Sequence, residues 1–97
     1  SAVLSVKDIA KNAGKIIARQ MSAFEYRQLG PLQRVIGGET SEGFRYTYLA
    51  QNIPMMGETD VVKRGKTLYY FHLYYRKELE ADSLPVWEEI LSSVRFS

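Results

Sequence analysis

The 97 residues are enough for one compact domain, and a hydrophobic fraction of 45% with 25% charged residues is typical of folded rather than disordered chains. The net charge of +2 is too small to indicate nucleic-acid binding, and the absence of cysteine excludes disulfides, thiolate nucleophiles and sulfur-ligated metals. No apolar run approaches the ~18 residues of a membrane span, and "SAVLSVKD" lacks the segments of a signal peptide.

The first expected element is one long helix over residues 5–30. Ser5 and Asp8 have the spacing of a capping box, and Gly30-Pro31 supplies a stop. The apolar residues fall within one broad arc of a helical wheel: Val6, Ile9, Ala10, Ala13, Ile16, Ile17, Met21 and Phe24. The opposite face carries a basic stripe with four-residue spacing: Lys7, Lys11, Lys15 and Arg19.

The period then changes from 3.6 to 2, which predicts antiparallel strands. Residues 32–38 form a short strand candidate, and residues 42–53 alternate, with aromatic side chains on one face. We expect residues 53–60 to interrupt the sheet, because Pro54 cannot donate to a ladder and Gly57 bends easily. Residues 58–76 predict a hairpin with its tip at residues 63–66.

The last expected element is a helix over residues 82–96. Asp82 or Ser83 can cap it, and Pro85 suits its first turn. Its apolar face comprises Leu84, Val86, Trp87, Ile90, Leu91 and Val94. The sequence thus predicts a single α+β domain, residues 1–97, with an antiparallel β-sheet of three to four strands flanked by a long N-terminal helix and a C-terminal helix.

The stretch "TLYYFHLYYR", residues 67–76, has no polar face when it is drawn as a strand. A strand buried on one side only should alternate, so we expect this one to be central and covered on both faces by the two helices. The alternative is a groove, in which tyrosine rings are buried while their hydroxyl groups reach water.

The run "GETDVVKRGKTLYYFHLYYRKELEADSLPVWEEILSSVRF" resembles the closing half of PsbP-like and DcrB-like domains. In that family a glycine-tipped hairpin leads through an aromatic strand and a short acidic loop to a last helix, whose end signature is matched here by Ile90, Leu91, Ser93, Arg95 and Phe96. "GGETSEGFRYTYLAQNIPM" is similar to an earlier segment of the family, and the likeness covers residues 32–97. Family members usually begin with additional strands before the first helix. Either those strands lie outside this sequence, or the sheet is shortened and has an edge open to strand addition or dimer formation.

The resemblance implies an antiparallel sheet packed by helices and, in most members, a non-catalytic role. Members serve as accessory subunits of photosynthetic membranes, exported lipoprotein domains, binders of a small GTPase and chaperones of secreted toxins. We therefore expect a binding or accessory domain without a cofactor, not an enzyme, in an exported or envelope-associated protein.

The expected binding surface joins the bend at residues 52–57 to the aromatic strands: Tyr46, Tyr48, Met55, Met56, Tyr70, His72 and Tyr74. The partner is expected to be another protein or a second copy of the chain, at the sheet edge or the aromatic face, with no nucleic acid and no membrane span. The basic stripe offers an anionic partner as an alternative, although a solvated helix face is the simpler interpretation.

A single histidine, His72, excludes His-pair metal sites and most Ser-His catalysis, and a hydrogen-bonded core residue is its simplest interpretation. The acidic loop with Glu78, Glu80 and Asp82 lacks the spacing of a calcium site, so no metal is expected. The alternative function is a small-molecule pocket protein or enzyme of the cone-shaped helix-on-sheet type. Its polar pair would be His72 with Tyr46 or Tyr70.

Overall fold

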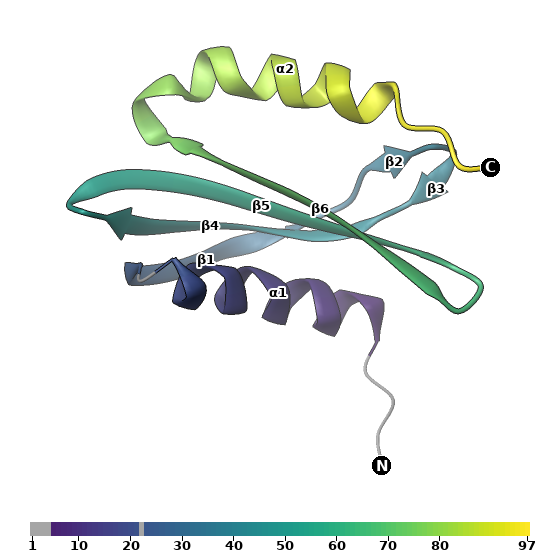
Figure 1. Cartoon of the computed structure of the whole chain (residues 1–97), viewed down its shortest axis with the longest axis horizontal. Helices are drawn as coiled ribbons and strands as arrows, with labels where there is room; N and C mark the ends of the chain where they lie inside the picture. Colours follow the sequence, from purple (N-terminus) through teal and green to yellow (C-terminus); the bar gives the residue numbers. More distant parts are fainter. Residues whose placement is uncertain (1–4, 22) are drawn as a thin grey trace.

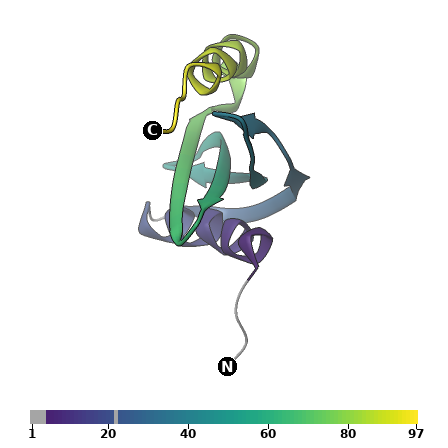
Figure 2. The same cartoon turned by 90° about the vertical axis from the view of Figure 1, so that its right-hand side faces the viewer.

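A computed structural model describes residues 5–21 and 23–97 and shows three layers, with one sheet lying between two helices (Figures 1 and 2). The helices are α1 (Val6–Gln20) and α2 (Glu80–Ser92). Four antiparallel strands form the sheet in the order β1-β4-β5-β6: β1 (Phe24–Leu32), β4 (Glu42–Ala50), β5 (Ile53–Arg64) and β6 (Thr67–Arg76). The short pair β2 (Val35–Ile36) and β3 (Glu39–Thr40) folds over the α2 side, and the predicted α+β class is confirmed.

Helix α1 is shorter than the sequence predicted. The Ser5 Oγ accepts the backbone N–H of Asp8 at 3.1 Å, as the capping box requires, but the helix ends at Gln20. The expected last turns are instead strand β1, while Ser22 lies outside the described residues. The helical spacing of apolar residues continues to Phe24, so this spacing alone predicted the wrong end for the helix. Pairing with β4, which begins at Phe24 opposite Leu49, decides the structure of this segment.

The expected break at residues 53–60 does not occur, because β5 runs without interruption from Ile53 to Arg64. Gln51 and Asn52 both have positive φ, 52° and 66°, and form a two-residue turn that closes on the pair Ala50 and Ile53. Because Ala50 and Ile53 form the hydrogen-bonded closing pair, the next residue, Pro54, points its backbone nitrogen away from β4. Strand β6 does not reach it, since the pairing of β5 with β6 begins at Met55. The missing N–H of Pro54 therefore removes no ladder bond.

Helix α2 begins two residues before the expected cap. A 3-10 turn, η1 (Lys77–Leu79), leads directly into the helix at Glu80, whose carboxylate accepts a hydrogen bond from the Tyr75 hydroxyl at 3.0 Å. Asp82 and Ser83 therefore lie inside the helix, and so does Pro85. The predicted hairpin tip is confirmed, with Gly65 and Lys66 as the turn between β5 and β6.

The aromatic strand β6 is an edge strand, so its expected central position was wrong. It pairs only with β5, while β5 pairs on both sides and holds the buried run from Met56 to Val62. Helix α1 packs over β4 and β5 and leaves the same face of β6 largely uncovered. The tyrosines on that face are therefore half-exposed, with Tyr70 at 46% and Tyr74 at 53%.

Neither helix buries its whole apolar face. Helix α1 buries only its small residues Ala10, Gly14 and Ala18, which let its backbone approach the sheet. Helix α2 buries Trp87 and Leu91 in a cluster with Ile36 and Val62. Large apolar side chains beside these contacts remain about half-exposed: Ile16 at 51% on α1, and Val86 at 56% and Ile90 at 50% on α2.

We predict that Gly14→Ala destabilises the domain although alanine is the better helix former. A Cβ at Gly14 would lie 2.6 Å from the buried Tyr46 ring, so that ring or the helix must move. Overpacking of this kind costs about 1–3 kcal/mol, whereas helix propensity alone favours alanine by about 1 kcal/mol. Denaturant unfolding measures the difference, with Lys15→Ala on the exposed face as the control. A Gly14→Ala variant more stable than the parent would contradict this packing.

Candidate functional site: the open edge at β6

The two edges of the sheet differ in how they are protected against strand addition. Along β1 the register shifts twice, between Phe24 and Arg27 and between Gln28 and Gly30, and Pro31 follows. The outer strand also carries the charges of Glu25 and Arg27. Bulges, proline and charge are the usual means by which an edge strand avoids pairing with another chain. This edge is therefore protected.

Strand β6 has none of these features. Its ten residues pair with β5 in unbroken register, and no proline, glycine, lysine, arginine or carboxylate occurs between Thr67 and Tyr75. The two-residue turn closes on the pair Arg64 and Thr67. In an antiparallel ladder, the two residues of such a closing pair hydrogen-bond to each other through both their N–H and their C=O groups. The next residue along β6 points these groups away from β5, and the two directions alternate along the strand. The outward groups belong to every second residue from Leu68: Leu68, Tyr70, His72 and Tyr74.

An apolar groove of about 490 Å³ runs beside this edge on the α1 side. Helix α1 forms one wall, and Tyr70 and His72 form the other. The residues that line it are Ile9, Asn12, Ala13, Ile16, Ile17, Tyr70 and His72. The basic residues of α1 lie on the other flank of the helix, toward β1, where the Gln28 side chain donates to the Lys11 carbonyl. The groove therefore borders an uncharged helix flank.

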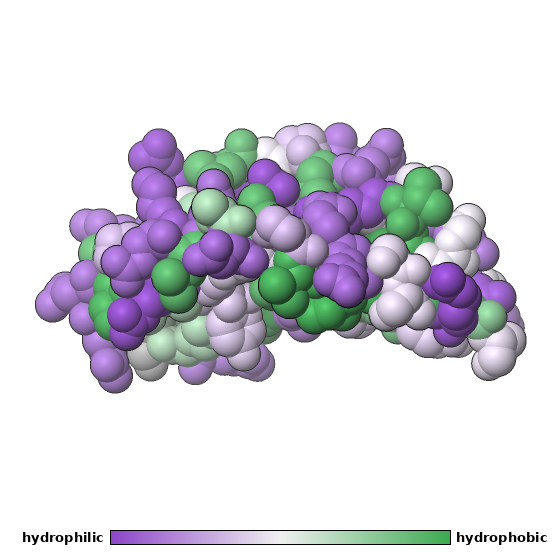
Figure 3. All heavy atoms as spheres, turned by 90° about the horizontal axis from the view of Figure 1, so that it is seen from above, coloured by the Kyte–Doolittle hydropathy of each residue, from purple (hydrophilic) through white to green (hydrophobic). Residues whose placement is uncertain are grey.

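A second groove of about 390 Å³ runs beside the same edge on the α2 side. Its lining joins the end of β6 to the exposed flank of α2: Leu73, Tyr74, Tyr75, Leu79, Asp82, Ser83, Val86, Trp87 and Ile90. Figure 3, which looks down on α2, shows hydrophobic side chains gathered at the lower centre of the view, the β6 side of the molecule. We call β6 with its two flanking grooves the β6 face.

His72 lines the α1-side groove together with the polar Asn12, and a hydrogen-bond chain holds it. Its Nδ1 lies 3.0 Å from the Thr59 hydroxyl, which lies 3.3 Å from the hydroxyl of Tyr46. Its ring stacks on Tyr70 with centroids 6.0 Å apart. Partial burial lowers the pKa of His72, and burial raises the pKa of Tyr46. Both groups are therefore neutral at pH 7, and Tyr46, fully buried under α1, cannot touch a ligand in the groove.

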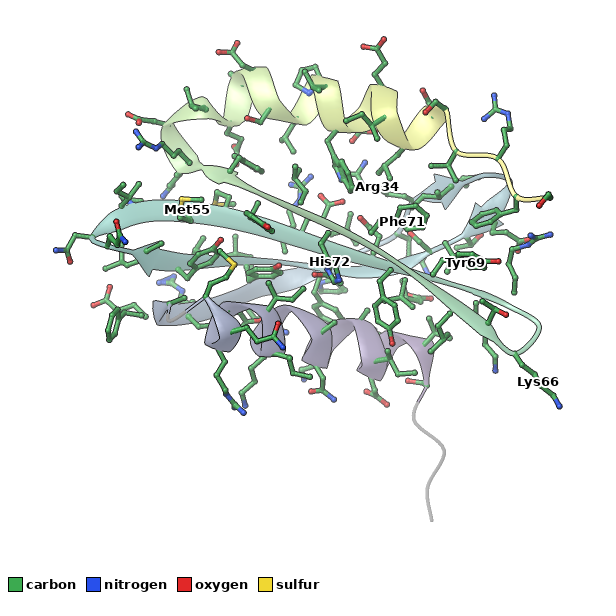
Figure 4. The ribbon with its side chains drawn as sticks, in the orientation of Figure 1. Arg34, Met55, Lys66, Tyr69, Phe71 and His72 are labelled. Atoms are coloured by element: carbon green, nitrogen blue, oxygen red, sulfur yellow. The ribbon has the colours of Figure 1, made fainter. Side chains whose placement is uncertain are left out.

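The structure divides the residues expected in one binding surface. Tyr70, His72 and Tyr74 lie together on the β6 face, whereas Tyr46 and Tyr48 are buried beneath α1. Tyr48, Met55 and Met56 together border a different hollow, of about 700 Å³, that also involves β1. Figure 4 shows Met55 near the opposite end of the sheet from Lys66.

The basic stripe of α1 is exposed along its length: Lys7, Lys11, Lys15 and Arg19. Within the described part of the chain these four side chains form no ion pair. Each therefore presents its full charge to solvent, and an anionic partner for the stripe stays a prediction.

The α2 side of the sheet holds a buried charged cluster that the sequence interpretation missed. The Glu58 carboxylate accepts hydrogen bonds from Arg34 Nε at 2.6 Å and Nη2 at 2.9 Å, and from Trp87 Nε1 at 3.1 Å. Arg45 Nε approaches the same carboxylate at 3.3 Å, and Arg34 also pairs with Glu88. Asp60 lies beside them, with its Oδ2 3.8 Å from Arg34 Nε, and both of its oxygens are buried without a hydrogen-bond partner among the described residues. Figure 4 shows Arg34 in this layer between the sheet and α2.

The two buried carboxyl groups titrate in opposite directions. Burial alone would raise the pKa of Glu58, but hydrogen bonds from Arg34 bring that pKa down to about 2. Burial and the neighbouring Glu58 raise the pKa of Asp60 to about 9. Asp60 is thus protonated at pH 7 and sits directly over Gly43, where a Cβ would lie 2.5 Å from its Oδ1. Glu58 and Asp60 are themselves buried, at 1% and 0% exposure, so a substrate could not reach either carboxyl and the cluster is a structural one.

A sequence signal for the cluster did exist. Glu58 and Asp60 are two residues apart in a strand that is otherwise apolar at its core, so both must face the same side. Buried carboxylates require a cation partner, and the structure supplies Arg34 and Arg45. The expectation that residues 53–60 form a bend hid this signal.

Other classes of site find no support in the described residues. No group of three or more His, Asp or Glu side chains in residues 5–21 and 23–97 could hold a metal ion. Neither of the described helices has the length and hydropathy to cross a bilayer.

Comparison with protein-family models, with curated proteins and with solved structures finds no match in any of the three. The resemblance to PsbP-like and DcrB-like domains therefore stays a prediction that rests on the quoted residues.

We predict that Asp60→Asn changes the pH dependence of stability. Below about pH 4 the carboxyl is protonated in both the folded and the unfolded chain, so the variant and the parent should differ little. Above that pH the unfolded chain ionises while folded Asp60 stays protonated up to its raised pKa of about 9. The unfolding free energy of the parent should therefore fall relative to that of Asp60→Asn, by more than about 1 kcal/mol at pH 8.

Denaturant unfolding from pH 4 to pH 8 measures this difference, and Asp82→Asn on the exposed side of α2 is the control. A difference between Asp60→Asn and the parent that stays constant with pH would show that Asp60 is ionised in the folded chain.

Proposed function

We propose that this domain is a non-catalytic interaction module that binds an extended protein segment at the β6 edge. The observation that carries this proposal is the contrast between the two edges of one sheet. Strand β1 is interrupted by bulges, proline and charges, whereas β6 pairs regularly over ten residues and carries no lysine, arginine or carboxylate from Thr67 to Tyr75. An added strand would satisfy the outward backbone groups of β6, as in other cases of β-strand addition.

The flanking grooves support the same proposal. Monomeric proteins seldom leave large apolar side chains grouped on one side, and a grouped patch is typical of an interaction site. Here the exposed residues of three elements lie beside one strand: Ile16 on α1, Tyr70 and Tyr74 on β6, and Val86 and Ile90 on α2. Side chains of an added strand would alternate between the two grooves. Placement of the protein in the cell envelope rests on the family resemblance alone.

The small-molecule alternative has one observation in its favour, the chain of hydrogen bonds from Tyr46 through Thr59 to His72. That chain leads into the core rather than into the groove, because Tyr46 is fully buried. In the groove, His72 would act without a second strongly acidic or basic group. Catalysis in such folds needs a polar pair in reach of the ligand, so the interaction module is the better-supported function.

We predict that Tyr74→Lys weakens peptide binding at β6. A phage-displayed library of random ten-residue peptides would be selected on sparsely immobilised protein, and sequences with alternating apolar residues should be enriched. Lysine at Tyr74 adds charge to the edge without disturbing the core, since Tyr74 is half-exposed. The selected peptides should bind this variant at least about tenfold more weakly, a loss of about 1.4 kcal/mol.

Phe24→Lys is the matched control, because Phe24 is an aromatic residue on the protected edge and, at 69% exposure, at least as accessible as Tyr74. Peptides that bind Tyr74→Lys as tightly as the parent, or that lose affinity for Phe24→Lys instead, would refute the proposed function.

A further inference from the structure

We infer that the segment bound at the β6 face is β6 of a second copy of this chain, so that two sheets join into one of eight strands. This inference rests on the proposed function, which requires an open β6 edge, and it names the partner. The strand order across the assembly would be β1-β4-β5-β6-β6-β5-β4-β1, with the two β6 strands side by side. Two-fold symmetry makes the added strand antiparallel, and the contact uses the same residues of both copies.

The first argument is that the apolar surface has three layers. A single peptide strand would cover the backbone edge of β6, but Ile16 and Ile90 project from helices on opposite faces of the sheet. Sheet and helix layers lie roughly 10 Å apart. Peptide side chains that enter the two grooves would cover only part of Ile16 and Ile90, whereas a second copy brings its own helices to the same levels. A partner that itself has a sheet between two helices can cover apolar side chains at all three levels.

The expected distances between the helices of the two copies are also compatible with this assembly. Helix α2 packs on β6 and reaches β5 through Trp87, so two α2 helices would be about two strand spacings, or ~10 Å, apart. That is the distance of helices in contact, and the exposed Val86 and Ile90 would meet there. Helix α1 lies over β4 and β5, so two α1 helices would be ~19 Å apart. The Tyr70 and Tyr74 rings of both copies would lie in the space between them.

The available area is sufficient. The domain measures 40 × 37 × 19 Å, and Figure 1 views it down the shortest axis with β6 nearest the viewer, α2 above it and α1 below it. The β6 face is therefore the broad side of a thin molecule. A contact over about half of that side would bury the roughly 800 Å² per partner that stable interfaces use.

Backbone geometry and charge together select a register. Only residues with outward groups can face each other in hydrogen-bonded pairs, so residues of even number must oppose residues of even number. If the two-fold axis passes between the two His72 residues, Tyr70 faces Tyr74 of the second copy, and Lys66 lies beside Glu78 of the second copy. The axis at Phe71 would instead place Lys66 beside Arg76. Of these two registers, charge complementarity favours the axis at His72.

The inference is tested by measuring the oligomeric state of the chain. Sedimentation equilibrium from about 1 µM to about 1 mM should show a reversible monomer–dimer equilibrium. Tyr74→Lys, Ile16→Glu and Ile90→Glu should each raise the dissociation constant at least tenfold, while Phe24→Lys leaves it unchanged. Circular dichroism and thermal unfolding verify that each variant is folded, and the exposure of all four side chains favours this.

Charge reversal tests the register. Lys66→Glu or Glu78→Lys alone should weaken the dimer several-fold, because each places like charges together twice per dimer. The double variant Lys66→Glu/Glu78→Lys should recover the affinity of the parent. A double variant as weak as the single variants would overturn the axis at His72.

Two outcomes separate the inference from the proposed function. A folded chain that stays monomeric up to about 1 mM, while displayed peptides still bind at β6, overturns the second copy but leaves the interaction module standing. A dimer that weakens with Tyr74→Lys but not with Ile16→Glu or Ile90→Glu overturns the three-layer contact. A monomeric chain that also binds no peptide at β6 overturns both.

Discussion

The position of α2 depends on one buried carboxylate. Glu58 lies on the central strand and is bound by Arg34, which follows β1, by Arg45 of β4 and by Trp87 of α2. One anion thus joins four segments that are distant in sequence. A buried charge is tolerated only when partners of this kind surround it, and removal of one partner leaves the others buried and uncompensated. The cluster therefore fixes where α2 can lie, and hence which flank of α2 remains in water.

A steric constraint sets the position of α1 on the other face. The buried Tyr46 ring leaves no room for a Cβ at Gly14 above it or at Gly57 beside it. Small residues along α1 let the helix lie close over this ring, and Ala10 packs with Phe44 and Val61. The helix is thereby held over β4 and β5, away from β6. The large side chains of α1, such as Ile16, border the groove instead of the core.

The Glu58 cluster positions α2 on one face of the sheet and the Tyr46 ring positions α1 on the other. Both positions have the same consequence for β6. The apolar flanks of both helices and the half-exposed tyrosines of β6 remain on one side of the molecule. Buried apolar surface stabilises by about 25 cal/mol per Å², so a patch left in water gains when it is covered. In the proposed interaction, the regular backbone of β6 would add directional hydrogen bonds to that gain. The proposed interface thus follows from where the core holds the helices.

Local chemistry by itself determined several parts of the fold. Alternation with a glycine turn identified the β5–β6 hairpin, the capping box identified the start of α1, and the apolar spacing around Trp87 identified α2. Of the expected site residues, Tyr70, His72 and Tyr74 lie together on the β6 face. Each of these features depends on neighbours within a few residues along the chain, and such patterns are legible in a sequence.

Only the tertiary structure decided the rest, because those features depend on pairing between distant segments. The arc that ends at Phe24 is equally compatible with a helix and with an edge strand, and pairing with β4 selects the strand. Pro54 is harmless only because β6 ends before reaching it. The lack of a polar face on β6 indicates burial on both sides, but strand order places β6 at an edge, where it pairs on one side only among the described residues. A sequence records which side chains are apolar, whereas strand order determines which of them the same chain can cover.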